Sequence, residues 1–214
     1  MFPMKAILWD NDGVLVDTER LYFEANRRAL LRAGIALTPE RFTDVSLRQG
    51  LSLLDLAGER GWSPKRIAGL REERDALYLR ILRKGVQVMP GVERMLGALR
   101  GKARMGIVTS AQRVHFDAMH SRTGLLPYFE FVLTREDYVR AKPAPDGYLE
   151  GLRRLGVGPA ECLAVEDSER GLESACAAGL RCLVVPNALT SGGNFSRALA
   201  VFPEASRLVA FLEP

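Results

Sequence analysis

Lys5-Ala6-Ile7-Leu8-Trp9-Asp10-Asn11-Asp12-Gly13 decides the fold, because a short apolar run is followed by two carboxylates two residues apart and then by a glycine. The apolar run predicts a buried strand, and Gly13 permits the turn that ends it. Residues two apart in an extended segment point to the same side, so Asp10 and Asp12 are expected to face one pocket. One carboxylate can attack phosphorus while the other protonates the leaving oxygen and later activates water. The pair therefore indicates a site for phosphoryl transfer.

A calcium-binding loop is the alternative interpretation of this acidic stretch, which extends from Asp10 to Glu19. An EF-hand needs oxygen ligands at its fifth and seventh positions and a glycine at its sixth. Here Gly13 is the fourth residue, and the apolar run Val14-Leu15-Val16 fills the liganding positions. The spacing therefore argues against calcium.

The composition is that of an ordinary globular protein, with 47% hydrophobic and 26% charged residues, and 214 residues suffice for a core with an inserted module. The net charge is +4, but Lys and Arg alternate with Asp and Glu, as in Arg71-Glu72-Glu73-Arg74-Asp75. We therefore expect solvated helix faces, anionic small substrates and no nucleic-acid partner. The chain has no apolar run of about 18 residues and no leader-like start, so we expect no membrane partner and a cytoplasmic location. Nothing requires more than a monomer.

The cysteines and histidines show no metal-ligand spacing. Cys162, Cys176 and Cys182 are odd in number and lie in apolar segments, which favours reduced structural thiols over disulfides or zinc ligands. His115 and His120 fall on one predicted helix, but a separation of five residues does not place two ligands on one helix face. Surface or packing roles are expected for both histidines.

Helical periodicity dominates after the first strand. An apolar face at helical spacing predicts a helix that stops at Gly34, and its members are Leu21, Ala25, Ala29 and Leu30. Thr38-Pro39 and Ser63-Pro64 are typical of helix N-caps with proline in the first turn. A helical module is therefore expected over residues 16–84.

Short apolar strands alternate with amphipathic helices in the rest of the chain. The predicted strands are Met105 to Val108, Phe131 to Leu133, Cys162 to Val165 and Cys182 to Val185. The predicted helices are Val92 to Leu99, Arg113 to Thr123, Asp146 to Leu155 and Gly171 to Ala178. This alternation predicts an α/β fold with a parallel sheet covered by helices on both faces, into which the helical module is inserted after the first strand.

Polar residues follow several of these strands. Thr109-Ser110 follows one, Glu166-Asp167 follows another, and Lys142 lies in a loop before a helix. Ligands bind beyond the carboxyl ends of the strands in open parallel sheets, so these residues are expected at the same edge as Asp10 and Asp12. Taken singly, Thr109 or Ser110 can cap a helix, the two acids can favour a helix start, and Lys142 can be a solvated loop residue. Their convergence at one edge favours a site.

Four ordered segments resemble the motifs of the haloacid dehalogenase-like hydrolase superfamily, in its phosphatase and beta-phosphoglucomutase-like branch. They are Asp10 to Glu19, Ile107-Val108-Thr109-Ser110, Lys142-Pro143-Ala144-Pro145-Asp146, and Val165-Glu166-Asp167-Ser168 with Gly171. The likeness covers essentially the whole chain. It implies a Rossmann-like, doubly wound core formed by residues 1–15 and 85–214, with an α-helical cap domain formed by residues 16–84.

The resemblance also implies roles for the matched residues. Asp10 would be the nucleophile that forms an aspartyl-phosphate, and Asp12 would be the general acid and base. Thr109, with Ser110 beside it, would bind the transferring phosphoryl group. Lys142 would neutralise both the nucleophile and the phosphate.

Charge counting supports a metal independently of the resemblance. Four carboxylates, those of Asp10, Asp12, Glu166 and Asp167, meet one positive charge, that of Lys142, where a phosphate must bind. Such a cluster would repel its substrate unless a cation joined it or an acid stayed protonated. Mg²⁺ prefers these oxygen ligands. The resemblance implies that Asp10, the backbone carbonyl of Asp12 and Asp167 would hold it, with Glu166 close to the metal or its waters.

The expected function is Mg²⁺-dependent hydrolysis of a small phosphate monoester, such as a sugar phosphate. Dehalogenation is disfavoured because it needs neither a metal nor the acid at Asp12. A phosphosugar mutase is the alternative, although mutase relatives usually carry a histidine on the first cap helix, where this chain has Tyr22. The non-enzymatic alternative is a phosphate sensor, which has no need for a nucleophile and an acid together.

Arg48 is a candidate substrate contact in the insert. It begins the loop Arg48-Gln49-Gly50 between two predicted helices. This loop can bind substrate, or it can be a plain helix-helix turn with exposed polar residues.

Overall fold

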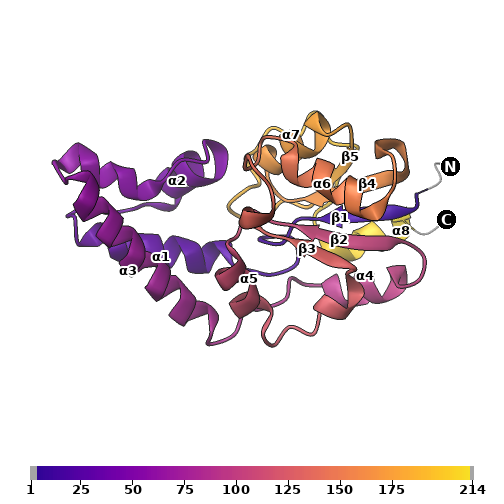
Figure 1. The fold of residues 1–214 in the computed structure, drawn as a ribbon, viewed down its shortest axis with the longest axis horizontal. Helices are drawn as coiled ribbons and strands as arrows, with labels where there is room; N and C mark the ends of the chain where they lie inside the picture. Colours follow the sequence, from indigo (N-terminus) through magenta and orange to yellow (C-terminus); the bar gives the residue numbers. More distant parts are fainter. Residues whose placement is uncertain (1–3, 213–214) are drawn as a thin grey trace.

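Six parallel strands form one sheet, with helices on both of its faces and a helical lobe at one end (Figure 1). The computed structural model describes residues 4–212. The strands lie in the order β3-β2-β1-β4-β5-β6, and each neighbouring pair is parallel. They are β1 (Ala6–Trp9), β2 (Arg104–Val108), β3 (Phe131–Leu133), β4 (Cys162–Glu166), β5 (Arg181–Val184) and β6 (Ala200–Val201). This is the doubly wound, Rossmann-like order, so the predicted fold class is confirmed.

The central strand β1 is fully buried because helices cover both of its faces. Ile7 and Trp9 pack on one side, in a cluster with α4 (Val92–Leu99), α5 (Arg113–His120) and α8 (Leu208–Leu212). Ala6 and Leu8 pack on the other side, with α6 (Asp146–Leu155) and α7 (Glu169–Ala177). Each large apolar side chain buried in this way contributes about 1.5–3 kcal/mol, which explains why the strand sequence is continuously apolar.

The predicted strands and core helices are confirmed, with small shifts at their ends. The helix that was expected to reach Thr123 ends at His120, and α7 begins at Glu169 rather than Gly171. Ser168 caps α7, since its hydroxyl accepts a hydrogen bond from the amide of Gly171 at 3.2 Å. Strand β6 was not predicted, because a strand of two residues is too short to show a periodic pattern of apolar side chains.

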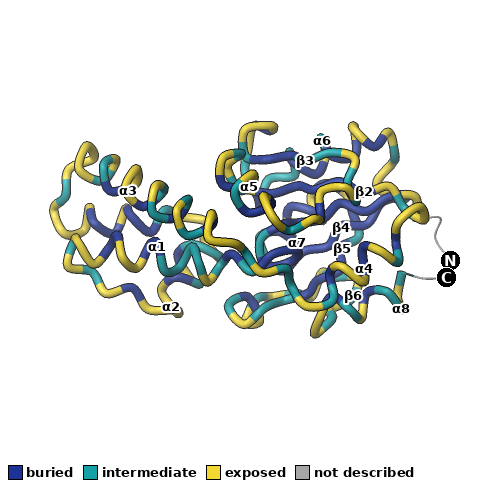
Figure 2. Tube along the Cα trace, turned by 90° about the horizontal axis from the view of Figure 1, so that it is seen from below, coloured by how far each residue is buried: buried dark blue, intermediate teal, exposed yellow. Residues whose placement is uncertain are grey.

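The helical insert, residues 19–82, forms the lobe at the left of Figure 1. Its elements are α1 (Glu19–Leu31), α2 (Pro39–Phe42), a π-helical turn (Thr43–Arg48), a 3₁₀ segment (Leu53–Arg60) and α3 (Pro64–Leu82). Both predicted N-caps are confirmed: Thr38 and Ser63 accept hydrogen bonds from the amides of Arg41 and Arg66. Buried residues lie on the inside of the lobe, and exposed residues lie on its outside (Figure 2).

Two crossings of the chain join the insert to the sheet, and they pair with each other. The amide of Asp17 donates to the carbonyl of Gln87 at 2.9 Å, and the amide of Met89 donates to the carbonyl of Leu15 at 3.0 Å. Between these bonds, Val16 pairs antiparallel with Val88. The insert is therefore attached at one narrow, two-stranded place, which suits a hinge.

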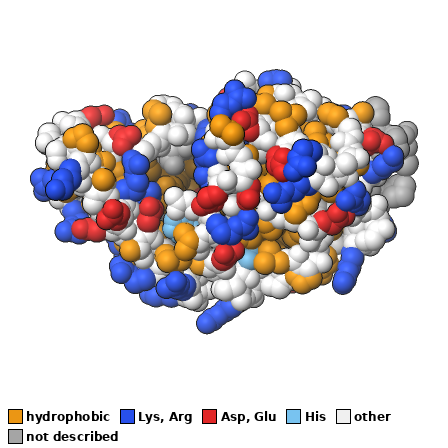
Figure 3. All heavy atoms as spheres, viewed as in Figure 1, with side chains coloured by type: hydrophobic (Ala, Val, Ile, Leu, Met, Phe, Trp, Pro, Cys, Tyr) orange, Lys and Arg blue, Asp and Glu red, His pale blue; other side chains and the backbone are white. Residues whose placement is uncertain are grey.

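The surface carries both signs of charge. On the face that Figure 3 shows, Lys and Arg side chains are interspersed with Asp and Glu, without a continuous basic stripe. Within residues 4–212, no helix has the length and apolar character needed to cross a membrane.

Candidate active site

The register of the sheet brings the predicted site residues to one edge. Trp9 of β1 pairs with Ile107 of β2 and with Val165 of β4. Asp10 directly follows β1, Thr109 directly follows β2, and Glu166 ends β4, so the three lie at the same level.

A cleft of about 580 Å³ opens between this edge and the helical insert. Six of the predicted site residues line it, namely Asp10, Asp12, Ser110, Lys142, Glu166 and Asp167. The insert supplies the opposite wall, including Tyr22 and Arg74.

Lys142 is buried at the base of the cleft, with 7% of its surface exposed. Its ammonium group donates to a carboxylate oxygen of Asp10 at 2.5 Å, to Glu166 Oε1 at 2.7 Å and to the carbonyl of Val108 at 2.9 Å. Burial alone would lower the pKa of Lys142, but the carboxylates of Asp10 and Glu166 outweigh burial and raise it. Lys142 is therefore a fixed positive charge beside Asp10.

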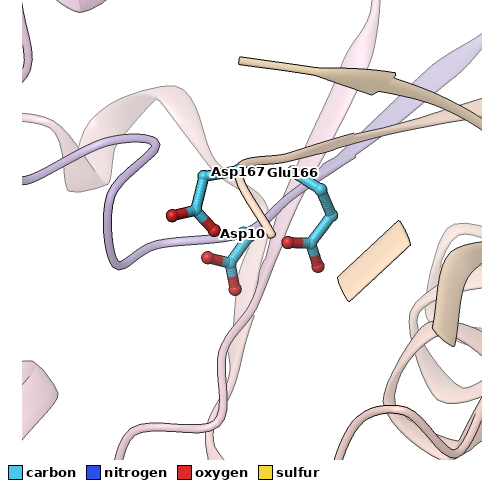
Figure 4. A group of neighbouring side chains, drawn as sticks. All are labelled: Asp10, Glu166 and Asp167. Carbon is cyan, nitrogen blue, oxygen red and sulfur yellow. The ribbon is translucent and has the colours of Figure 1, made fainter. Parts of the chain in front are cut away.

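Three carboxylates converge at this edge of the sheet (Figure 4). Ligand oxygens of Asp10, Glu166 and Asp167 lie within 4.8 Å of one another, and all three residues are buried. Burial and, to a smaller extent, the negative charge of Glu166 raise the pKa of Asp10 well above its ordinary value. Burial and, to a smaller extent, the negative charge of Glu19 raise the pKa of Asp167 in the same way. The single charge of Lys142 does not balance this group.

The donor set fits a hard divalent cation such as Mg²⁺. Carboxylate oxygens are the ligands that such ions prefer, and a cation would relieve the repulsion within the group. Gly13 leaves room beside Asp167, because a Cβ atom at residue 13 would lie 2.3 Å from Asp167 Oδ2. Asn187 fixes this carboxylate by donating to the same oxygen at 2.8 Å.

Glu166 anchors the base of the site. Its Oε1 accepts from Lys142 and from the hydroxyl of Tyr148 at 2.5 Å, whereas its Oε2 is buried and has no hydrogen-bond partner among residues 4–212. Gly171 packs directly over it, since a Cβ atom there would lie 1.9 Å from Oε2. The free oxygen leaves one acceptor available to a cation or to its waters.

Asp12 is held by two threonines. Thr18 donates to Oδ1 at 2.5 Å, and Thr109 donates to Oδ2 at 3.1 Å. The Thr109 hydroxyl also accepts from the amide of Ala111, at 3.0 Å. Thr109 is fully buried and contacts Asp12 rather than the open cleft, whereas Ser110 is exposed in it. The two acids of the first motif therefore have separate partners, Asp10 with Lys142 and Asp12 with Thr18 and Thr109.

Comparison with known proteins identifies the family. A model of the haloacid dehalogenase-like hydrolases matches residues 4–179. The chain belongs to this family. It is 33% identical to protein CbbY of Rhodobacter capsulatus, over 95% of this chain and 94% of that protein. It is 34% identical to the phosphorylated carbohydrates phosphatase of Thermotoga maritima, over 92% of this chain and 93% of that protein.

A solved structure shows the same fold. The crystal structure of beta-phosphoglucomutase from Clostridium difficile superposes with a TM-score of 0.78 at 22% identity, covering 96% of this chain and 93% of that chain. The predicted resemblance to the phosphatase and phosphoglucomutase-like branch of the hydrolase family is thus confirmed, and the helical insert corresponds to a cap domain.

The structure places Arg48 apart from the other predicted site residues of this hydrolase. Arg48 is exposed at the end of the π-helical turn, and its Nη2 donates to the carbonyl of Gly192 in the core at 2.8 Å. It is not among the residues that line the cleft. The structure therefore shows Arg48 as a contact between cap and core, because the turn directs its side chain toward the loop after β5. A contact of Arg48 with substrate stays a prediction.

The contacts of two residues beside the site were not predicted from the sequence, although the packing role expected for His120 agrees with its burial. Asn187 follows β5 at the same edge of the sheet as Asp10, and this position is the sequence signal that could have identified it. His120 is buried, and its Nε2 lies 2.7 Å from Asn11 Oδ1. Burial lowers the pKa of His120 to about 4, so the ring is neutral at pH 7. Nothing in the sequence pattern pairs Asn11 with His120, because tertiary packing alone brings α5 beneath the first loop.

Proposed function

We propose that the protein is a Mg²⁺-dependent phosphatase that hydrolyses a small phosphate monoester of the phosphorylated-carbohydrate class. The observation that carries the proposal is the contact of 2.5 Å between Asp10 and the buried ammonium of Lys142, at the base of a cleft that can admit a small molecule. The positive charge of the buried lysine favours the ionised, attacking form of the neighbouring carboxylate and so opposes the effect of burial on Asp10. The name of the Thermotoga maritima relative, a phosphorylated carbohydrates phosphatase, supports the substrate class.

In the proposed mechanism, an oxygen of Asp10 attacks phosphorus while the bond from phosphorus to the ester oxygen breaks. Asp12 gives its proton to the leaving oxygen, and an aspartyl-phosphate remains on Asp10. Asp12 then removes a proton from water, which attacks phosphorus and releases phosphate and free Asp10. Lys142 offsets negative charge in both steps, and Ser110 and Thr109 are proposed to orient the phosphoryl group.

Asp10, Asp167 and the backbone carbonyl of Asp12 are proposed to hold Mg²⁺, with Glu166 close to the ion or its waters. When bound, the ion supplies positive charge that offsets the charge of the phosphoryl oxygens. The chain's own residues fix the geometry: Asn187 holds Asp167, and Tyr148 holds Glu166.

The division into a core of residues 1–15 and 85–214 and a cap of residues 16–84 remains part of the proposal. The paired crossings near Val16 and Val88 support it, because both boundaries fall beside this attachment. A cap on a narrow hinge can exclude water while the aspartyl-phosphate forms and can then open for product release.

Mutase activity is the second candidate, and the position of Tyr22 argues against it. Tyr22 lines the cleft, where its hydroxyl accepts a hydrogen bond from Arg74. A tyrosine whose hydroxyl oxygen already accepts a hydrogen bond from an arginine is a poor general base. Hydrolysis is therefore favoured over transfer within a sugar phosphate.

A panel of phosphorylated sugars and other small phosphate esters tests the proposed function. We expect phosphate release that requires Mg²⁺, with the highest kcat/KM among phosphorylated carbohydrates. Phosphate binding without turnover of any ester would instead favour a sensor, and conversion between sugar phosphate isomers without phosphate release would favour a mutase.

Asp12→Asn is expected to lower kcat by about 10²–10⁴-fold for esters with poor leaving groups, because proton donation and water activation are both lost. Esters with good leaving groups need less protonation, so the phosphoenzyme is expected to form and to persist. A burst of leaving-group release followed by slow turnover checks this result. Equal loss of phosphorylation for good and poor leaving groups would contradict the role of Asp12.

Asp167→Asn is expected to raise the Mg²⁺ concentration for half-maximal activity by about 10-fold or more, since an anionic ligand is lost while Asn187 and the shape of the site remain. Glu173→Gln is the matched control, because Glu173 is an exposed acid on α7. Mg²⁺ titrations of chelator-treated enzyme measure the shift. Full activity of the parent protein in metal-free buffer would refute the metal requirement.

A further inference from the structure

Arg170 is a partly buried cation of the cleft that the mechanism above leaves without a role. It is the second residue of α7 and lines the cleft together with Lys142. Its guanidinium reaches two parts of the chain at once. Nη2 donates to the backbone carbonyl of Lys142 in the core, and Nη1 donates to the carbonyl of Ser46 in the cap at 3.4 Å.

The cap is shaped to receive this guanidinium. Gly50 lies against it so closely that a Cβ atom at residue 50 would be 2.4 Å from Arg170 Cζ, and the backbone there has a φ of +67°. Ser46 belongs to the π-helical turn Thr43–Arg48, and the carbonyl groups at the C-terminal end of a helical segment attract cations. Both features favour a specific contact over chance proximity.

Through Arg170, the position of the cap becomes linked to the position of Lys142. The ammonium of Lys142 is fixed by Asp10, Glu166 and the carbonyl of Val108, as described above. Its backbone is held from the other side by Arg170. Movement of Ser46 away from the core would remove one of the two carbonyl acceptors that hold the guanidinium, and would loosen its hold on the loop that carries Lys142.

We propose that Arg170 is a positioning residue that couples closure of the cap to the placement of Lys142, an inference that rests on the proposed phosphatase function. Its Nε is buried and has no hydrogen-bond partner in the part of the chain that the structure describes, which offsets part of the free energy gained from the two hydrogen bonds to carbonyl groups. This leaves the contact weak enough to open when product leaves.

Arg48 supplies a matched control within the same cap segment. It also joins cap to core, through the carbonyl of Gly192, but it does not touch Lys142. Arg170→Met and Arg48→Met each remove one guanidinium bridge between cap and core. The first also releases the Lys142 loop, whereas the second leaves it in place.

Amide hydrogen exchange without substrate tests the coupling independently of activity. In Arg170→Met we expect faster exchange than in the parent protein over residues 43–51 and over residues 139–147. In Arg48→Met we expect faster exchange over residues 43–51 and 189–193, with residues 139–147 unchanged. Unchanged exchange over residues 139–147 in Arg170→Met would overturn the proposal, whether or not the enzyme hydrolyses phosphate esters. Unchanged exchange in the central strands shows that each variant is folded.

Kinetics give the second measurement, on whichever ester the parent protein hydrolyses best. Arg170→Met is expected to raise KM and to lower kcat by about 10-fold or more, because a small displacement of a catalytic group is costly. Arg48→Met is expected to raise KM while kcat stays close to that of the parent protein. Arg170→Lys is expected to recover part of kcat, because a lysine can donate to one of the two carbonyl groups but not to both.

Identical changes in kcat and KM in the two Met variants would mean that Arg170 only tethers the cap to the core, and would overturn the coupling. If the parent protein hydrolyses no ester, the proposed function fails, and hydrogen exchange alone decides the role of Arg170.

Discussion

Asp10→Asn is expected to reduce kcat by about 10⁴-fold or more, because the amide keeps the shape of the side chain but loses the charge that attacks phosphorus. The fold is expected to persist, since an asparagine oxygen can still accept from Lys142. Burial and the charge of Glu166 raise the pKa of Asp10, so its ionised form costs stability at neutral pH. The variant is therefore expected to unfold at the same temperature as the parent protein or at a higher one.

Rapid quenching of the parent protein with a phosphorus-labelled substrate checks the chemistry behind this result. The label is expected on Asp10 and is expected to be absent in the variant. Asp117→Asn is the matched control, because Asp117 is an exposed acid on α5, and its kcat is expected to be unchanged. A label on a serine, threonine or histidine would show that another residue is the nucleophile.

Lys142→Met is expected to affect both activity and stability. Removing the ammonium leaves Asp10 and Glu166 as neighbouring buried carboxylates, which is expected to lower the free energy of unfolding by about 3–5 kcal/mol. The pKa of Asp10 rises further without the lysine, so less of the nucleophile is ionised, and kcat is expected to fall by about 10²–10³-fold or more. Denaturant unfolding and steady-state kinetics measure the two effects separately.

A second substitution separates the structural role of Lys142 from its chemical role. Glu166→Gln, added to Lys142→Met, removes one of the two carboxylates while the amide oxygen can still accept from Tyr148. The double variant is expected to regain most of the stability and none of the activity. Lys65→Met is the matched control, because Lys65 is exposed on α3, and it is expected to change neither the free energy of unfolding nor kcat. Recovery of activity in the double variant would mean that Lys142 only balances Glu166.

The sequence predicted the sheet and the gathering of polar residues at one edge well, because both depend on local signals. Continuous apolar runs identify buried parallel strands, and polar residues directly after them must lie at one edge. Asp10, Lys142 and Asp167 were found in this way, and the structure brings them together.

The contacts that the sequence could not predict are those between distant segments. The π-helical turn Thr43–Arg48, where the amide of Gln49 donates to the carbonyl of Asp44, follows neither the helical nor the strand period, so the direction of Arg48 was not predictable. The pairing of Asn11 with His120, and of Arg170 with Ser46, arises only when separate elements pack. Residue type and spacing along the chain do not indicate how separate elements pack.

The place of β1 at the centre of the sheet has a consequence for how the chain folds. Trp9 pairs with Ile107 on one side and with Val165 on the other, so β1 is synthesised long before its two partner strands. The helical insert packs α1 against α3 within its own residues and can form first, whereas the sheet must wait until β2 and β4 have left the ribosome. Until then the apolar residues of β1 are exposed. Slow refolding, with aggregation before the sheet closes, is the expected consequence of placing the proposed nucleophile directly after the central strand.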